Sequence, residues 1–240
     1  RFYNYNTTTN LYNAVANPVT QTFGLGNGYL IRTPNDHPTT PTIWNGQFNG
    51  NLNNGNVDVN LTYIASGQSF NMIGNPYPST IDADTFITDN LSDITGTLYF
   101  WRKTNNAAGT AYATYTLGGA TTTSPTSPTP NGIIQTGQGF IVEANNVSTP
   151  TTSFLNSQRV GNNQNQFFRS TITAEKHRIW LNLTDANGLF SQSLIGYMTN
   201  ATEAFDNGID GKYLNDSPVC FNSLLNDEEY TVQFRGLTFA

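Results

Sequence analysis

Asparagine–glycine pairs divide the chain into short segments, and this spacing constrains the fold more than any other sequence feature. The pairs begin at residues 27, 45, 49, 54, 131, 187 and 207. Asn-Gly is the strongest short-range signal for a tight β-hairpin, because both residues tolerate the left-handed backbone conformation of such turns. After the fourth pair, NVDVNLTYI (56–64) alternates apolar and polar residues, which is typical of a strand with one buried face.

Further segments of this kind predict strands at 95–103, 112–117, 139–144, 178–184 and 192–198. Helical periodicity is scarce, so we expect only a short helix at 200–206 and a helical turn at 83–87, capped by Thr80 or Asp82. Many short strands with closely spaced turns indicate antiparallel sandwiches or barrels. The sequence therefore predicts an all-β fold of two tandem antiparallel β-sandwich units, jelly-roll or immunoglobulin-like, at 1–147 and 148–240.

An internal repeat supports two units. GLGNGYLIRTP (24–34) and QTGQGFIVEAN (135–145) share the pattern Gly-x-Gly-aromatic-aliphatic-aliphatic, and in both cases a turn-rich segment leads into an alternating strand. We interpret the two copies as related β-sandwich units. Chance similarity between glycine-rich β segments is the alternative.

The composition indicates an extracellular β protein. Charged residues make up only 11% of the chain, and most polar side chains are uncharged. The chain contains 33 Asn and 35 Thr, residue types that suit turns and the solvent-facing positions of strands. The net charge of −6 without a basic cluster argues against a nucleic acid or an anionic membrane as partner. The single cysteine, Cys220, excludes an intrachain disulfide and is expected to be a small core residue.

No stretch approaches the roughly 18 apolar residues of a membrane span, so we expect no membrane insertion. The chain opens in a polar, aromatic segment, RFYNYN. We therefore expect a signal peptide to have been removed or to lie upstream.

The stretch NMIGNPYPST (71–80) predicts a stiff corner between strands. Pro76 and Pro78 hold the backbone extended and restrict the residue before each of them. Tyr77 is expected to pack inward between these two fixed positions. The alternative is a ligand-binding loop that presents Tyr77.

A set of motifs then indicates a family. In order, the chain contains GNPYPSTIDADTFI, GTLYFWRK, YATY, GQGFIVEA, NSQRV, FFR, HRIWLNLT, LIGYM and ATEAFDNGIDGKYLNDS. From about residue 24 onward, this set resembles large secreted surface proteins of the Bacteroidetes. It is similar to the region that precedes and enters the type C sorting domain of type IX secretion system substrates.

The resemblance implies secretion across the outer membrane, with a final location on the cell surface or outside the cell. The implied partners are the type IX outer-membrane translocon and its shuttle protein. EEYTVQFRGLTFA (228–240) looks like the first strand of a truncated sorting domain. We therefore expect contacts with the translocon from five residues of this segment: Tyr230, Val232, Phe234, Leu237 and Phe239.

Acidic residues in FDNGIDGKYLND (205–216) form a candidate calcium site. Ca²⁺ prefers several carboxylate and carbonyl oxygens on a glycine-containing loop, and Asp206, Asp210 and Asp216 could supply them. The alternative is a polar turn in which aspartates cap the backbone. A weaker second cluster comprises Asp82, Asp84, Asp89 and Asp93.

The sequence gives little support for a catalytic site. His37 is expected in an exposed loop, and His177 lies at a strand start between Lys176 and Arg178. There is no G-x-S-x-G elbow and no Cys/His pair at a recognisable spacing. We therefore expect a protein that is not an enzyme.

Aromatic residues leave a glycan-binding alternative. Trp101, Tyr112 and Tyr115 could stack on sugars, as could Trp44 and Trp180. A carbohydrate-binding module predicts an exposed, coplanar row of aromatic rings, whereas a structural stalk predicts that the three tryptophans are mostly buried. A third possibility, a secreted glycoside hydrolase domain, predicts two carboxylates about 5 to 9.5 Å apart in one cleft. We favour a non-catalytic, stalk-like or adhesin-like segment of a type IX secretion substrate.

Overall fold

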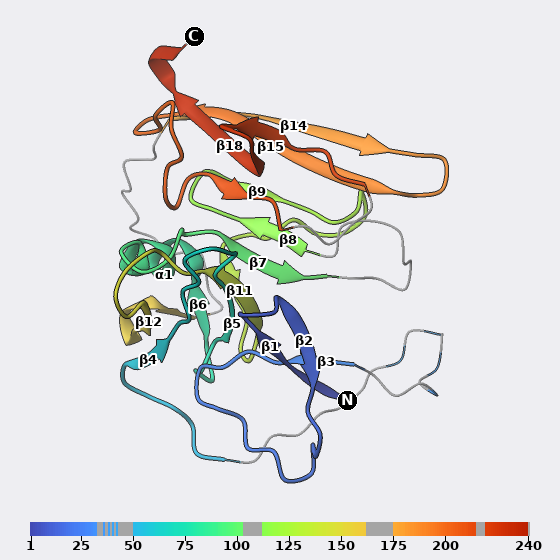
Figure 1. Ribbon diagram of the computed structural model, residues 1–240, viewed down its shortest axis with the longest axis vertical. Helices are drawn as coiled ribbons and strands as arrows, with labels where there is room; N and C mark the ends of the chain where they lie inside the picture. Colours follow the sequence, from blue (N-terminus) through green and yellow to red (C-terminus); the bar gives the residue numbers. More distant parts are fainter. Residues whose placement is uncertain are drawn as a thin grey trace.

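The computed structural model describes residues 1–32, 36, 38, 40, 42, 50–102, 112–161, 175–214 and 219–239. Over these residues the protein is almost entirely β, with one α-helix, which confirms the predicted all-β class (Figure 1). The strands before the helix are β1 (Phe2–Asn6), β2 (Leu11–Ala14), β3 (Leu30–Ile31), β4 (Val57–Asn60), β5 (Phe70–Gly74) and β6 (Thr80–Asp82). The helix α1 (Ala83–Asn90) is followed by β7 (Leu98–Trp101), β8 (Tyr112–Tyr115), β9 (Ala120–Thr121), β10 (Ile133–Ile134), β11 (Gly139–Glu143), β12 (Thr151–Phe154) and β13 (Arg159–Val160). The last strands are β14 (Lys176–Thr184), β15 (Phe190–Met198), β16 (Gly211–Lys212), β17 (Ser223–Leu225) and β18 (Glu228–Gly236); short 3₁₀ turns lie at Asn156–Gln158 and Leu237–Phe239.

The strands expected from alternation are present as β4, β7, β8, β11, β14 and β15. The predicted turn at 83–87 is α1, and Asp82 is its N-cap. The prediction of a helix at 200–206 is wrong. The Asp206 carboxylate accepts hydrogen bonds from the backbone N–H and hydroxyl of Thr202, so this segment closes a loop instead.

A five-stranded sheet, in the order β5-β11-β7-β8-β9, lies at the centre of the first part of the chain. One face packs on α1, β4 and β12, where Phe86, Phe140 and Phe154 meet in the core. The opposite face carries Tyr99 and Ile141 and packs on the β1–β2 hairpin. Because the sheet is covered on both faces, successive residues of β7 and β11 are both buried.

A second sheet forms from the order β14-β15-β18-β16, with β17 also paired to β18. In Figure 1 it lies beyond β8 and β9 at one end of the molecule. Its inner side chains include Leu194, Val232 and Phe234, all with 0% exposure. β15 and β18 are parallel, which differs from the wholly antiparallel units expected.

Two strands that follow residue 147 pair with strands of the first part of the chain. β12 pairs with β4, and β13 pairs with β6. The predicted division at 147/148 thus lies before strands that complete the first set of sheets. The two Gly-x-Gly copies also lie in this part, on either side of β5: Gly74 N donates to Gly26 O at 2.8 Å, and Gly139 pairs with Gly74 across the ladder.

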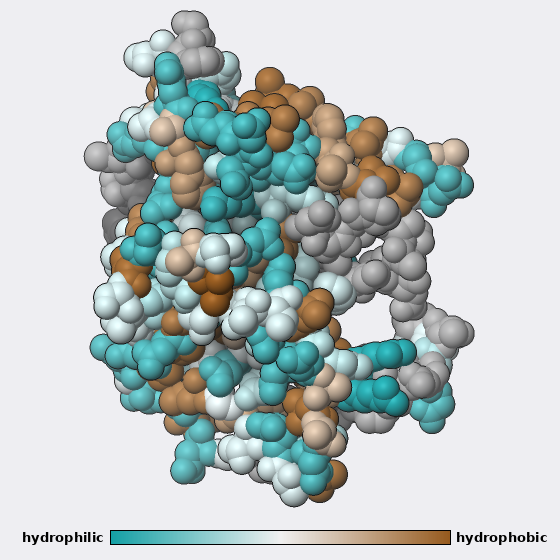
Figure 2. Space-filling view, viewed as in Figure 1, coloured by the Kyte–Doolittle hydropathy of each residue, from teal (hydrophilic) through white to brown (hydrophobic). Residues whose placement is uncertain are grey.

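Apolar side chains are exposed on the outer face of β14, at the edge of the second sheet. Ile179, Leu181 and Leu183 are 61%, 38% and 41% exposed. Brown hydrophobic atoms gather at this end of the molecule in Figure 2. No helix within the described ranges has the length and apolar character needed to cross a membrane.

Candidate functional site

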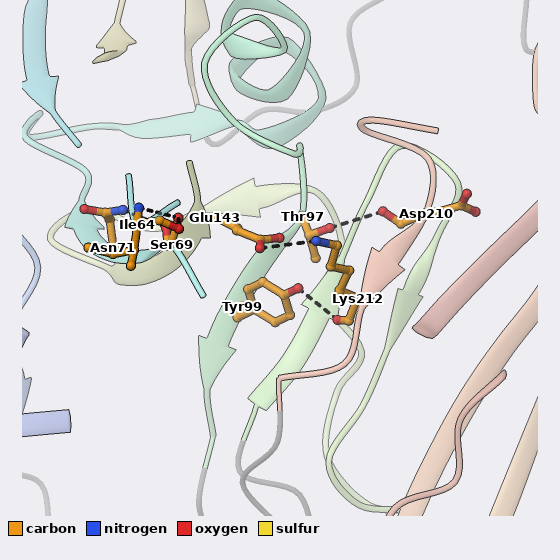
Figure 3. Close-up of polar contacts among 8 residues, drawn as sticks. All are labelled: Ile64, Ser69, Asn71, Thr97, Tyr99, Glu143, Asp210 and Lys212. Atoms are coloured by element: carbon orange, nitrogen blue, oxygen red, sulfur yellow. Dashed lines mark hydrogen bonds and ion pairs between the residues drawn. The ribbon is translucent and has the colours of Figure 1, made fainter. Parts of the chain in front are cut away.

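A polar junction joins the central sheet to the second sheet, and Figure 3 shows its main contacts. Lys212 in β16 reaches Glu143 in β11, with Nζ 3.3 Å from Oε1. The Tyr99 hydroxyl of β7 donates to the Lys212 carbonyl at 2.8 Å. The Thr97 hydroxyl donates to the Asp210 carbonyl at 3.2 Å. Together these contacts join β7 and β11 to the loop and strand that lead into the second sheet.

Burial controls the electrostatics of this junction. Removal from water raises the pKa of Glu143, and the ammonium group of Lys212 opposes that rise. Burial, followed by the charge of Glu143, raises the pKa of Tyr99. The Glu143 Oε2 atom has no hydrogen-bond partner among the described residues. The ion pair is therefore the main interaction that keeps a charged carboxylate at this depth.

Asp206 and Asp210 are brought together, as the calcium prediction requires. However, Asp210 Oδ1 accepts from Phe234 N at 2.7 Å, and its Oδ2 accepts from Asp206 N at 3.0 Å. Burial raises the Asp210 pKa to about 6. Asp216 lies outside the described residues, and the described residues contain no group of three His, Cys, Asp or Glu side chains that could hold a metal. The two aspartates thus act as backbone caps, and calcium binding stays a prediction.

The weaker acidic cluster is also used structurally. Asp82 caps α1, and Asp84 accepts a hydrogen bond from the Tyr115 hydroxyl at 2.7 Å. Asp89 accepts from Gln158 and Asp93 from the backbone of Thr151. Asp84, Asp89 and Asp93 thus join α1 or its flanks to other elements, whereas Asp82 caps the helix itself.

A close approach between the backbones of Gly96 and Gly208 is the third part of the junction. Gly96, with φ of +80°, packs on Gly208, and a Cβ atom added at Gly96 would lie 2.5 Å from the Gly208 Cα. Gly208 N donates to Thr95 O, and Gly208 O accepts from Leu117 N, both at 2.7 Å. Only glycine leaves room for this contact, so the loop before β16 is fixed directly to the central sheet.

The predicted aromatic platform is only partly assembled. Trp101 packs edge-on against Tyr112 and Tyr12, with interplanar angles of 79° and 74°. Tyr115 lies on the opposite face of β8, where it contacts Asp84. The rings of Trp101 and its neighbours are therefore not a coplanar row.

The predicted burial of the tryptophans is also wrong for Trp101 and Trp180. Trp101 is 37% exposed and Trp180 is 43% exposed. The Trp180 Nε1–H donates to the Ala120 carbonyl at 3.0 Å, which holds its ring against β9. Trp44 lies outside the described residues.

The residues expected to contact the translocon are mostly internal. Tyr230, Val232 and Phe234 are 3%, 0% and 0% exposed in β18. Leu237 is half-buried in the 3₁₀ turn that follows, which also contains Phe239. In the folded chain, the first three side chains are not a surface that another protein could contact.

Histidine and cysteine are the two other residue types considered for catalysis. His177 Nε2 lies 2.8 Å from Glu175 Oε1 on an exposed strand. His37 lies outside the described residues. Cys220 is exposed, so its assignment to the core is wrong. Among the described residues around it, 219–222 belong to no strand.

The double-proline corner is confirmed. Tyr77 is 2% exposed, and its hydroxyl lies 2.7 Å from the carbonyl oxygens of Gly55 and Phe154. The Asn75 side chain accepts from Tyr77 N and donates to Ser79 O. Tyr77 therefore holds β12 and the segment before β4 together and is not presented to a ligand.

Comparison with known proteins places the chain in a family. A family model described as a domain of unknown function (DUF8693) matches residues 1–240. The chain belongs to the DUF8693 family. Neither the curated proteins nor the solved structures gave a match. The description of the DUF8693 family names no activity.

Sequence reasoning missed the Glu143–Lys212 pair. One signal was available, because Glu143 is the only charged residue in the apolar strand GFIVEA. A charge in such a strand must be exposed or paired. Its partner in this DUF8693 chain is 69 residues away, and no local pattern indicates Lys212.

Proposed function

We propose that the chain is a non-catalytic structural segment of a secreted cell-surface protein, acting as a stalk. The observation that supports this proposal most is the junction, where the second sheet is attached to the central sheet by backbone contacts and a half-buried ion pair. A stalk has to hold neighbouring regions at a fixed distance. Domains connected only by a linker move independently by default, whereas an interlocked interface prevents that motion.

The junction can be tested by thermal unfolding. We expect one calorimetric transition for the chain, because the central sheet and the second sheet unfold together. Lys212→Met leaves Glu143 buried without its partner and should destabilise the chain by about 2–3 kcal/mol. Glu143→Gln with Lys212→Met should recover much of that loss. Two well-separated transitions in the unmodified chain would contradict the stalk proposal, and Glu203→Gln, an exposed carboxylate change, is the control.

Export through the type IX system is the second half of the proposal, and it rests on the motif resemblance. The proposed partners are the translocon and its shuttle protein, and the proposed location is the cell surface or the medium. Because Tyr230, Val232 and Phe234 are buried in the folded chain, this half of the proposal requires that the segment is recognised before β18 packs into the sheet.

A pull-down from detergent-solubilised Bacteroidetes outer membranes tests this half. We expect an unfolded chain, kept in urea until mixing, to retain the translocon or its shuttle, and the folded chain to retain much less. Deletion of residues 228–239 should abolish retention by the unfolded chain. Equal retention by the deleted chain, or none by either form of the intact chain, would contradict recognition through this segment.

A further inference from the structure

A groove lies between the N-terminal hairpin and the strands β4 and β5, away from the junction. Its volume is about 460 Å³, within the range of small-ligand sites. β1 contributes Asn4 and Asn6 to its wall, and β2 contributes Asn13. β1 contacts β5, and both strands appear side by side in Figure 1.

Every side chain that lines the groove is uncharged. The lining consists of Asn, Thr and Tyr residues, together with Leu61, Met72 and Ile73. A charged ligand would therefore leave water without a compensating partner, which is unfavourable. An uncharged polar ligand avoids that penalty.

Three asparagine amides at the groove are free to bind a ligand. Asn4 and Asn13 are directly opposite each other in the β1–β2 ladder, and both are exposed. Asn27 is also exposed and is bridged to Ile73 of β5. Contacts among the described residues give none of these three side-chain amides a hydrogen-bond partner. An amide offers one acceptor and two donors in a plane, which suits adjacent hydroxyl groups.

The groove is held by a separate set of contacts. Asn71 is 8% exposed, and its oxygen accepts from Thr62 N at 2.8 Å and from the Thr7 hydroxyl at 3.2 Å. Its nitrogen donates to the Thr62 and Ser69 carbonyls. On the other face of the hairpin, Tyr12 packs into the aromatic cluster below the central sheet. The three free amides thus project from a fixed frame, which reduces the entropy lost on binding.

The groove is lined mainly by polar atoms, and its three apolar residues contribute little exposed surface. Leu61 is 8% exposed and Ile73 is 1% exposed, and Met72 lies beside them. Neutral sugars carry many hydroxyl groups, which suit a polar lining of amide and hydroxyl groups. We propose that this groove binds an uncharged oligosaccharide, with the Asn4, Asn13 and Asn27 amides bound to its hydroxyl groups. The proposal is independent of the stalk and export proposals, and it uses different residues from the Trp101 and Tyr112 set.

Titration with defined oligosaccharides tests the groove. The probes are cellohexaose, laminarihexaose, xylohexaose and mannohexaose, with a hyaluronan hexamer and trigalacturonic acid as acidic comparators. We expect at least one neutral probe to bind and to shift the side-chain amide NMR signals of Asn4, Asn13 and Asn27. The acidic probes should bind at least about tenfold more weakly.

Substitution identifies the surface that binds. The triple variant Asn4→Ala, Asn13→Ala and Asn27→Ala should weaken binding by about tenfold or more, because each lost amide removes hydrogen bonds to the sugar. The control is a triple variant of exposed asparagines that do not line the groove, Asn17→Ala, Asn51→Ala and Asn146→Ala. Thr8→Trp, at the exposed rim, should block the groove without disturbing the Asn71 contacts.

Three results would overturn the proposal. One is the absence of binding by every neutral probe up to about 10 mM, which is weaker than functional recognition requires. Another is unchanged affinity in both the triple groove variant and Thr8→Trp. The third is acidic probes binding as tightly as neutral ones, which would contradict an uncharged ligand.

Discussion

Asp210 is a carboxylate that the fold removes completely from water. Burial raises its pKa from 3.8 to about 6, whereas its hydrogen bonds from Phe234 N and Asp206 N act in the opposite direction. Asp206 raises this pKa further and Arg235 lowers it. The folded chain therefore binds a proton at this site between about pH 4 and pH 6, while the unfolded chain has released it.

This difference in proton binding determines whether the free energy of unfolding rises or falls with pH. As the pH rises from about 4 to 6, the free energy of unfolding should fall by up to about 3 kcal/mol through Asp210. Asp210→Asn should flatten that part of the profile, measured by urea unfolding at each pH. Burial also raises the Glu143 pKa, so some slope should remain. Glu143→Gln is the matched control, and equal slopes in Asp210→Asn and the unmodified chain would contradict the assignment.

At the scale of the element, α1 depends on a single capping residue. Asp82 Oδ1 accepts from Thr85 N and from the Thr85 hydroxyl, both at 2.8 Å. An eight-residue helix is too short to be stable alone, so this cap and the packing of Phe86 and Ile87 maintain it.

Removal of the cap should therefore destabilise the chain. Asp82→Ala should lower the free energy of unfolding by about 1 kcal/mol, measured by chemical denaturation at neutral pH. Asp82→Asn retains a capping oxygen and should lose much less. If both variants lost the same amount, the charge and not the cap would be the important feature.

The elements were predictable where their determinants are local. Alternation in NVDVNLTYI identifies β4, and the residues around Asp82 identify the start of α1. The parallel pairing of β15 with β18 was not predictable, because the choice of neighbour depends on packing between distant segments. The exposure of β14 was missed for a similar reason, since RIWLNLT has the composition of a buried strand.

At the scale of the whole molecule, the approach of Gly96 to Gly208 fixes one sheet on the other. Gly96→Ala should lower the free energy of unfolding by about 2–4 kcal/mol, because its positive φ is unfavourable for alanine and its Cβ atom would meet backbone. Thermal unfolding measures this loss.

Gly137→Ala is the matched control. Gly137 also has a positive φ, +67°, but a Cβ atom there would meet nothing within 4 Å. It should show only the backbone penalty, about 1 kcal/mol. Equal effects of the two substitutions would mean that the close contact between the sheets contributes little.

The candidate sites depend on contacts between segments that are distant in sequence. They were therefore the least predictable features. Asp206 and Asp210 were identified as a cluster, but the role of Asp210 depends on its hydrogen bond from Phe234 in β18, more than twenty residues later. The groove was not identified, because Asn4 and Asn27 are common residue types in this chain. Only folding places them around one hollow.

The position of β18 has a consequence for the order in which the chain folds. This strand is internal to its sheet, between β15 and β16, although it follows all the other strands of the described residues in sequence. A chain that emerges from a ribosome or a membrane pore with its N-terminus first can form the β14–β15 hairpin early. The sheet cannot close until residues 228–236 are available. Assembly of this sheet therefore requires β18, as expected for pairings between distant segments.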